Sequence, residues 1–161
     1  MYSNAAVANF ITDHFVPVRV HVRDQKDEFA RLGAKFSAHW TPTVLMLDPA
    51  GEERSRIEGF LPADEFLALL KLGLARVALD RGDFQEAERR YREVVEEHPD
   101  TEAAAEAMYW EGVSRYKGTG EAAALSATAS RLAKQYKDSP WARKASVWAT
   151  PAADAAAPNA K

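Results

Sequence analysis

The pattern of apolar positions predicts a helix followed by a strand at the start of the chain. Apolar residues recur at helical intervals over 3–14, after a Ser-Asn pair that can cap the first backbone N–H groups. Over 16–22, valines alternate with proline or polar residues, which is the period-two pattern of a half-buried strand. Pro17 cannot donate a ladder hydrogen bond, so we expect this strand at the edge of a sheet.

A second helix and two further strands are predicted over the next forty or so positions. Helical spacing covers 26–37 and is followed by the corner Trp40-Thr41-Pro42-Thr43. The run 44–47 is wholly apolar, which favours a central strand that is buried on both faces. After the turn residues 48–51, the stretch 53–60 returns as a more polar strand, so the sheet would have about three strands.

From Pro62 onward the apolar period is helical. Pro62 suits the first turn of a helix whose apolar stripe runs from Phe66 to about Leu79. Asp83 predicts the N-cap of the next helix, with the Glu86 carboxylate reaching back to the N–H of the cap. This segment therefore reads as a pair of consecutive helices.

An internal repeat predicts that helical hairpins continue toward the C-terminus. Shifting the chain by 38 residues places Asp100-Thr101 on Asp138-Ser139 and Trp110 on Trp148. Each copy is a polar cap followed by small residues and a tryptophan, which suits helices that stack closely. Residues 150–161 are rich in alanine with two prolines and are expected to be a disordered tail.

These elements resemble two known families. The order of elements over 15–60, with its Thr-Pro corner, resembles the second half of a thioredoxin-fold domain, and the spacing of apolar and small residues over 74–99 resembles a tetratricopeptide hairpin. The resemblance implies an α/β thioredoxin-like unit with an incomplete sheet over 1–72. It further implies an all-α tetratricopeptide-like hairpin array over 73–149 that shares one long helix with the first unit.

The chain departs from the thioredoxin pattern at its front. The family's Cys-x-x-Cys would precede residue 1, and the sequence contains no cysteine. The family's strand between those expected at 16–22 and 44–47 is also missing, and each unpaired buried backbone group would cost about 1–3 kcal/mol. Three alternatives stay open: the two strands pair directly, a partner fills the slot, or the sequence is a shortened form of a longer protein, which we rank first.

The corner is the candidate binding site. In thioredoxin-like proteins this proline follows a cis peptide bond, and the residue before it offers its backbone to an extended client. The resemblance therefore implies a cis Thr41–Pro42 bond and a peptide-binding site at Trp40, Thr41, Pro42 and Thr43. The competing interpretations are a purely structural corner and, for Trp40, packing into the core, which is the commoner role of tryptophan and the one we favour.

Charge and composition exclude several classes of function. The net charge of −3 comes from 21 basic and 24 acidic residues mixed along the chain, so neither nucleic acid nor membrane is an expected partner. The histidines show no ligand spacing, and we expect no metal or cofactor. Without a spanning segment or a secretion signal in the sequence as given, a cytoplasmic location is expected.

We therefore expect a redox-inactive protein-binding or adaptor module whose partner is a polypeptide. Two alternatives remain open. The sequence could be a shortened thiol-disulfide oxidoreductase whose Cys-x-x-Cys lies upstream, or a structural module that assembles as a homo-oligomer.

Overall fold

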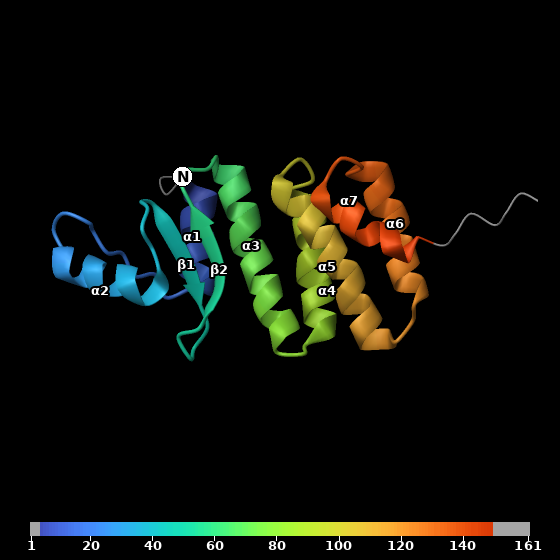
Figure 1. The fold of residues 1–161 in the computed structure, drawn as a ribbon, viewed down its shortest axis with the longest axis horizontal. Coiled ribbons are helices and arrows are strands. Elements are labelled where there is room, and N and C mark those ends of the chain that lie inside the picture. The colour runs from blue at the N-terminus through green and yellow to red at the C-terminus, as the bar shows by residue number, and fades with distance from the viewer. Residues whose placement is uncertain (1–3, 150–161) are drawn as a thin grey trace, which may run out of the picture.

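The computed structural model describes residues 4–149, in which a small α/β unit at one end continues into a stack of helices (Figure 1). In chain order the elements are α1 (Ala5–His14), α2 (Lys26–Phe36), β1 (Thr43–Leu47), β2 (Glu53–Glu58), α3 (Ala63–Asp80), α4 (Phe84–Glu97), α5 (Glu102–Thr119), α6 (Ala123–Gln135), α7 (Pro140–Ala145) and the 3₁₀ turn η1 (Ser146–Trp148). An α/β unit followed by a helical array is the fold class expected from the sequence.

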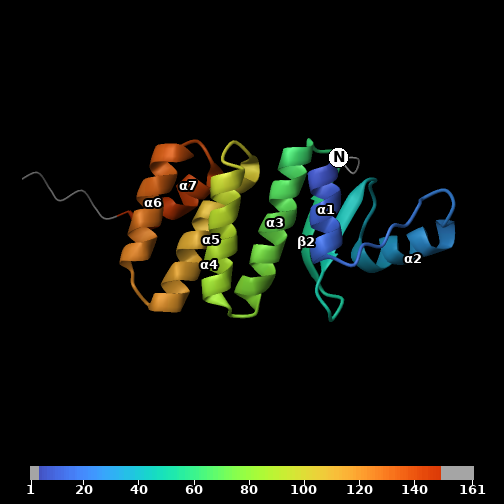
Figure 2. The ribbon, with the colours of Figure 1, turned by 180° about the vertical axis from the view of Figure 1, so that it is seen from behind.

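Helix α1 begins as predicted and covers one face of the sheet. The Asn4 side chain accepts hydrogen bonds from the backbone N–H groups of Ala6 and Val7, which caps the helix. Val7 is fully buried in a cluster with Phe66 and Met46. Figure 2 shows α1 on the side of the sheet where α3 also lies.

The sheet is an antiparallel hairpin of β1 and β2. Its register places Val44 opposite Ile57 and Leu45 opposite Arg56. Because side chains alternate along a strand, Val44 turns toward the helices together with Met46, while Leu45 faces the other side. Gly51, at φ +82°, closes the turn between the strands.

The strand predicted over 16–22 does not form, and over the described residues 4–149 the sheet has two strands where about three were expected. The segment crosses open solvent, with Val16 92% and Val18 83% exposed. The alternation of apolar and polar residues indicates only that one side of the segment is apolar. A strand also needs a neighbouring strand that hydrogen-bonds its backbone. The direct pairing of this segment with 44–47, one of the alternatives above, is therefore not what the structure contains.

The prediction that 44–47 is a central strand is also wrong. β1 has β2 as its single neighbour within the described sheet, and of its residues only Met46 is buried. An all-apolar run of this length does not distinguish a central strand from an edge strand with one covered face.

Helix α3 belongs to both parts of the molecule. One of its faces packs on the sheet unit through Phe66 and Leu70, and another packs on α4 and α5 through residues such as Ala68, Leu72 and Ala75. Leu69 contacts the core of the sheet unit and the core of the helical array. Pro62 stands at the N-cap and not inside the first turn as expected.

Helix α4 begins at the predicted cap, but half of the expected capping box is absent. The Asp83 side chain accepts from the N–H of Glu86 at 3.2 Å. The return bond does not form, because the N–H of Asp83 donates to the carbonyl of Ala78. The Glu86 carboxylate instead binds Arg89 and Arg90.

The sequence repeat corresponds to stacked helices, as predicted. α5 begins at Glu102 and α7 at Pro140, which matches the 38-residue offset. The Ser139 side chain caps α7 by accepting from the N–H of Ala142, whereas the Thr101 hydroxyl donates to the carbonyl of His98. α7 has 6 residues against 18 in α5, so the second copy is abbreviated. The tail predicted over 150–161 lies outside the described residues.

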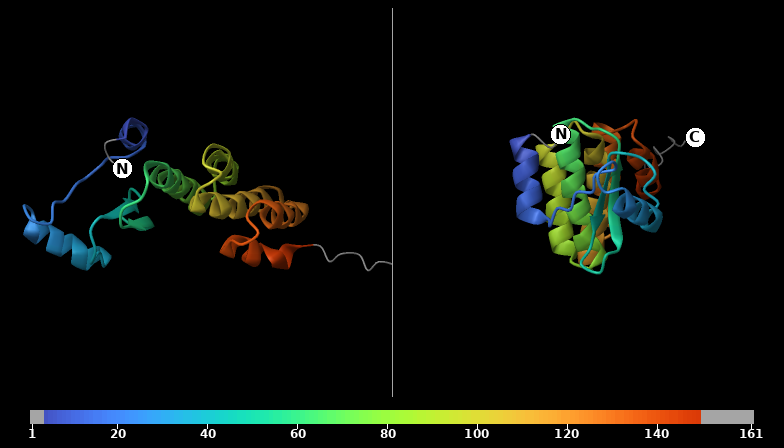
Figure 3. Two further views of the ribbon diagram at one scale, coloured as in Figure 1. Left: turned by 90° about the horizontal axis from the view of Figure 1, so that it is seen from above. Right: turned by 90° about the vertical axis from the view of Figure 1, so that its left-hand side faces the viewer.

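Seen along and across its long axis, the molecule is extended, with the α/β unit and α6–α7 at opposite ends (Figure 3). No helix within 4–149 combines the length and the apolar character needed to cross a membrane.

Candidate functional site

The corner predicted from sequence connects α2 to β1. α2 ends at Phe36, and Ser37 turns the chain with a left-handed φ of 51°. The Thr41–Pro42 peptide bond is cis. The Pro42 carbonyl accepts from the N–H of Gly59 at 2.8 Å, and the Thr43 hydroxyl donates to the carbonyl of Trp40 at 2.7 Å. These two bonds fix the corner to the start of the hairpin.

Trp40 points into solvent, which corrects the expectation that it fills the core. Its side chain is 67% exposed. The residue lies before the first paired position of β1, where no described element covers it. The indole is therefore available for contact, as a binding role requires.

A second exposed aromatic residue, Phe60, lies at the same end of the hairpin. The bond between Pro42 and Gly59 continues the ladder by one position, which brings Phe60 next to Thr41. Phe60 is 74% exposed. Phe60 is not among the site residues predicted from the sequence, although a phenylalanine directly after a glycine at the end of a polar strand is a signal that could have indicated it.

Among residues 4–149, the backbone groups along the outer edge of β1 are unpaired at every second position. In an antiparallel pair, alternate residues direct both N–H and C=O to the neighbouring strand. Val44 and Met46 bond β2 in this way, so the groups of Thr43, Leu45 and Leu47 face away from it. Within 4–149 the backbone N–H and C=O of Thr41 also have no hydrogen-bond partner.

This edge lacks the features that usually prevent strand addition. Natural edge strands are protected by charged side chains, prolines or covering elements. β1 reads Thr-Val-Leu-Met-Leu and carries no charge, and its last residue, Leu47, is 42% exposed. Of the two strands, only β2 carries charged residues.

Arg56 of β2 holds the end of α2 beside the sheet. Its guanidinium donates to the Glu53 and Glu58 carboxylates and to the carbonyls of Phe36 and Ser37. An open hollow of about 460 Å³ lies next to it, between α2 and the β1–β2 turn. Because all its N–H groups already donate hydrogen bonds, the Arg56 guanidinium has a structural role. It fixes the end of α2, and with it the corner, beside the sheet.

The turn between the strands is fixed by an ion pair. The side-chain hydrogen bond from Arg54 to Asp48, at 2.8 Å, and the backbone N–H of Glu52 hold the pKa of Asp48 below its usual range. Asp48 is therefore ionised at neutral pH, and the hairpin register depends on charged and hydrogen-bonded turn residues as well as on β1 itself.

Within 4–149 no group of three or more acidic, cysteine or histidine side chains could hold a metal ion. The predicted site residues Trp40, Thr41, Pro42 and Thr43 are contiguous. In the structure Phe60 and the outer edge of β1 lie next to these four residues.

Comparison with protein families gives two matches. The model of a thioredoxin-like domain matches residues 2–74, and that of a tetratricopeptide repeat matches residues 67–101. The matches overlap inside α3, the helix that contacts both cores. Searches of curated proteins and of solved structures returned no match.

Proposed function

The chain is a thioredoxin-like domain fused to tetratricopeptide-like helices, and on that premise we propose that it binds an extended segment of a partner polypeptide at the outer edge of β1. The site runs from Trp40 to Leu47 and includes Phe60. The observation that carries the proposal is the row of unpaired backbone groups on an uncharged strand that begins at two exposed aromatic side chains.

Strand addition suits this edge because it pairs groups that now face solvent. An extended client would accept from the N–H groups of Thr43, Leu45 and Leu47 and donate to their carbonyls. Each such bond contributes about 0.5–1.5 kcal/mol net. Trp40 and Phe60 would contact client side chains at one end, and aromatic anchors of this kind supply most of the affinity in small interfaces.

The proposed recognition is non-covalent. The sequence holds no cysteine, so this chain has no thiol that could exchange with a client disulfide. We therefore propose an adaptor that is redox-inactive, whose helical array offers a second surface for protein contacts.

Binding can be tested with peptides selected from a phage-displayed random 12-residue library on the immobilised full chain. Affinities of the synthetic peptides would be measured by fluorescence anisotropy. We expect Trp40→Ala to weaken binding about tenfold or more, because a truncated aromatic anchor typically costs about 2 kcal/mol. The matched control is Val147→Ala, which shortens another exposed apolar side chain (80%) at the far end of the molecule.

Backbone methylation of the selected peptide separates strand addition from simple aromatic contact. Two peptides would be compared, one N-methylated at its odd-numbered residues and one at its even-numbered residues. Since every second N–H of an added strand faces β1, one of the two peptides should lose binding and the other should keep it. Equal binding of the two methylated peptides would contradict the proposal. So would an equal loss of peptide affinity in Trp40→Ala and Val147→Ala. A concentration-dependent dimer that peptide dissociates would instead assign the edge to a second copy of the chain.

A further inference from the structure

A separate groove lies between the two units, on the side of α3 where α4 stands to its left and α1 to its right (Figure 2). It encloses about 240 Å³. Its lining residues come from three helices: Phe10 and His14 of α1, Lys71 of α3, and Arg89, Arg90 and Glu93 of α4. The groove exists only because the sheet unit and the array share α3.

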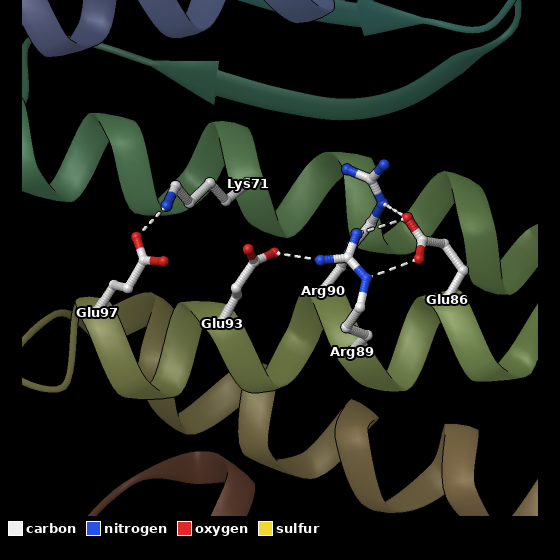
Figure 4. A network of polar contacts seen from close by, with 6 residues as sticks. All are labelled: Lys71, Glu86, Arg89, Arg90, Glu93 and Glu97. Atoms are coloured by element: carbon white, nitrogen blue, oxygen red, sulfur yellow. Dashed lines mark hydrogen bonds and ion pairs between the residues drawn. The ribbon is translucent and has the colours of Figure 1, made fainter.

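One wall is a network of ion pairs (Figure 4). Arg89 donates to the Glu86 carboxylate at 2.8 Å and to Glu93 at 3.2 Å, and Arg90 donates through Nε to Glu86 at 2.6 Å. Lys71 pairs with Glu97. All three carboxylates of this wall therefore already accept hydrogen bonds.

The donors of the groove are not all used. A guanidinium has five N–H donors, and Arg90 donates only its Nε–H to Glu86. Its two terminal nitrogens have no partner among residues 4–149, and Figure 4 shows them directed from α4 toward α3. On the opposite wall, the ring nitrogens of His14 likewise have no partner within the same range. The groove therefore has free hydrogen-bond donors that a ligand with acceptor atoms could bind.

Charge and shape narrow the acceptor to a carboxylate. The groove has three cations and three carboxylates, so their charges cancel: Lys71, Arg89 and Arg90 against Glu86, Glu93 and Glu97. Because there is no excess of positive charge, the groove suits a monoanion better than a dianionic phosphate. The free end of a guanidinium matches a carboxylate in two parallel bonds.

The α1 wall is aromatic. The rings of Phe10 and His14 lie 4.4 Å apart, and the Lys71 ammonium is 5.7 Å from the Phe10 centroid. This wall can pack against the hydrocarbon part of a ligand whose charged end reaches across to α4.

We propose that this groove binds a carboxylate through the terminal nitrogens of Arg90, with the ligand's hydrocarbon part against Phe10. The other hollow, beside Arg56, has no free guanidinium donors, because all the N–H groups of that guanidinium already donate hydrogen bonds. The carboxylate can belong to an acidic side chain of a polypeptide or to a free small acid, since both present the same group. The groove is distinct from the β1 edge.

The test is an NMR titration of the full chain that follows the Arg90 Nε–H and His14 ring resonances. The probes are the blocked peptide acetyl-(Glu-Ala)₃-amide, its Gln-Ala analogue, and glutarate. We expect the Glu peptide or glutarate to shift both signals in a saturable way, and the Gln peptide to shift neither. In Arg90→Gln the affinity, followed at His14, should fall about tenfold, as expected for a lost charge-assisted pair.

Arg115→Gln is the matched control, because Arg115 is exposed on α5 and its side chain has no partner within 4–149. His14→Ala, on the other wall and outside the ion-pair network, should also weaken binding. Tighter binding of the peptide assigns the site to a polypeptide, and comparable binding of glutarate assigns it to a small acid. Absence of binding by both acids, binding of the Gln peptide, or equal affinities of Arg90→Gln and Arg115→Gln would overturn the proposal. Trp40→Ala should leave this titration unchanged, so the groove and the β1 edge are tested independently.

Discussion

Two helical glycines lie where neighbouring elements approach closely. A Cβ placed on Gly112 of α5 would lie 2.0 Å from the Thr128 hydroxyl and 2.7 Å from its Cβ. A Cβ placed on Gly73 of α3 would lie 2.1 Å from Cε of Met46, the free end of a flexible side chain. The two positions therefore differ in how easily the neighbour can move.

We predict that Gly112→Ala destabilises the chain by about 1–3 kcal/mol, because the buried, β-branched Thr128 cannot give way. Gly73→Ala should cost clearly less, since Met46 can change rotamer and alanine gains about 1 kcal/mol of helix propensity over glycine. Urea unfolding followed by circular dichroism measures both. If the two variants are equally stable, the close approach of α5 and α6 described above is wrong.

The residues of the candidate site show what sequence can and cannot provide. The corner from Trp40 to Thr43 could be found because a Thr-Pro pair before an apolar run is a local pattern. The exposure of Trp40 could not, because it depends on which elements cover the corner. Phe60 joins the site only through the register of the hairpin, which a single sequence does not specify at its ends.

At the scale of elements, helices were predicted more reliably than strands. The helices at 5–14, 26–36 and 63–80 follow from apolar spacing within one segment, and the first of them also has the cap residue Asn4. The strand predicted at 16–22 failed because a strand requires a partner from elsewhere. The prediction that 44–47 is a central strand failed for the same reason, because Val44-Leu45-Met46-Leu47 is equally apolar at the edge and in the centre of a sheet.

Helix α4 gives a pH-dependent prediction. Hydrogen bonds from Arg89 and, second, Arg90 lower the pKa of Glu86 to about 2. Because the folded-state pKa lies below the unfolded value of about 4.3, the stabilisation from Glu86 is complete above that value and is lost as pH falls toward 2. The ion pairs face solvent, so we expect a contribution below about 1 kcal/mol.

The measurement compares the free energy of unfolding of Glu86→Gln and the unmodified chain at pH 7 and pH 3. The difference between them should shrink at pH 3. Glu121→Gln, at an exposed position whose side chain has no ion pair within 4–149, serves as the control and should differ little from the unmodified chain at either pH. A Glu86→Gln difference that grows on acidification would contradict the assigned pKa direction.

At the scale of the whole molecule, α3 joins two recognition surfaces. The β1 edge lies on the sheet unit and the carboxylate groove lies between that unit and α4. Contacts at the start of α3 reinforce the junction: Asp64 bonds the buried His98 at 2.6 Å, and Glu65 accepts from the N–H of Glu102 at 3.3 Å. These contacts connect the start of α3 to the α4–α5 connection, so the array and the sheet unit hold a fixed relation through α3.

Amide hydrogen exchange along 41–47, with and without a selected peptide, tests the central claim most directly. In the free chain the amides of Val44 and Met46 should exchange slowly, and those of Thr43, Leu45 and Leu47 rapidly. Peptide binding should protect the three fast amides and leave the two slow ones little changed. Fast amides that stay fast in the saturated complex would show that the outer edge of β1 does not bind the polypeptide.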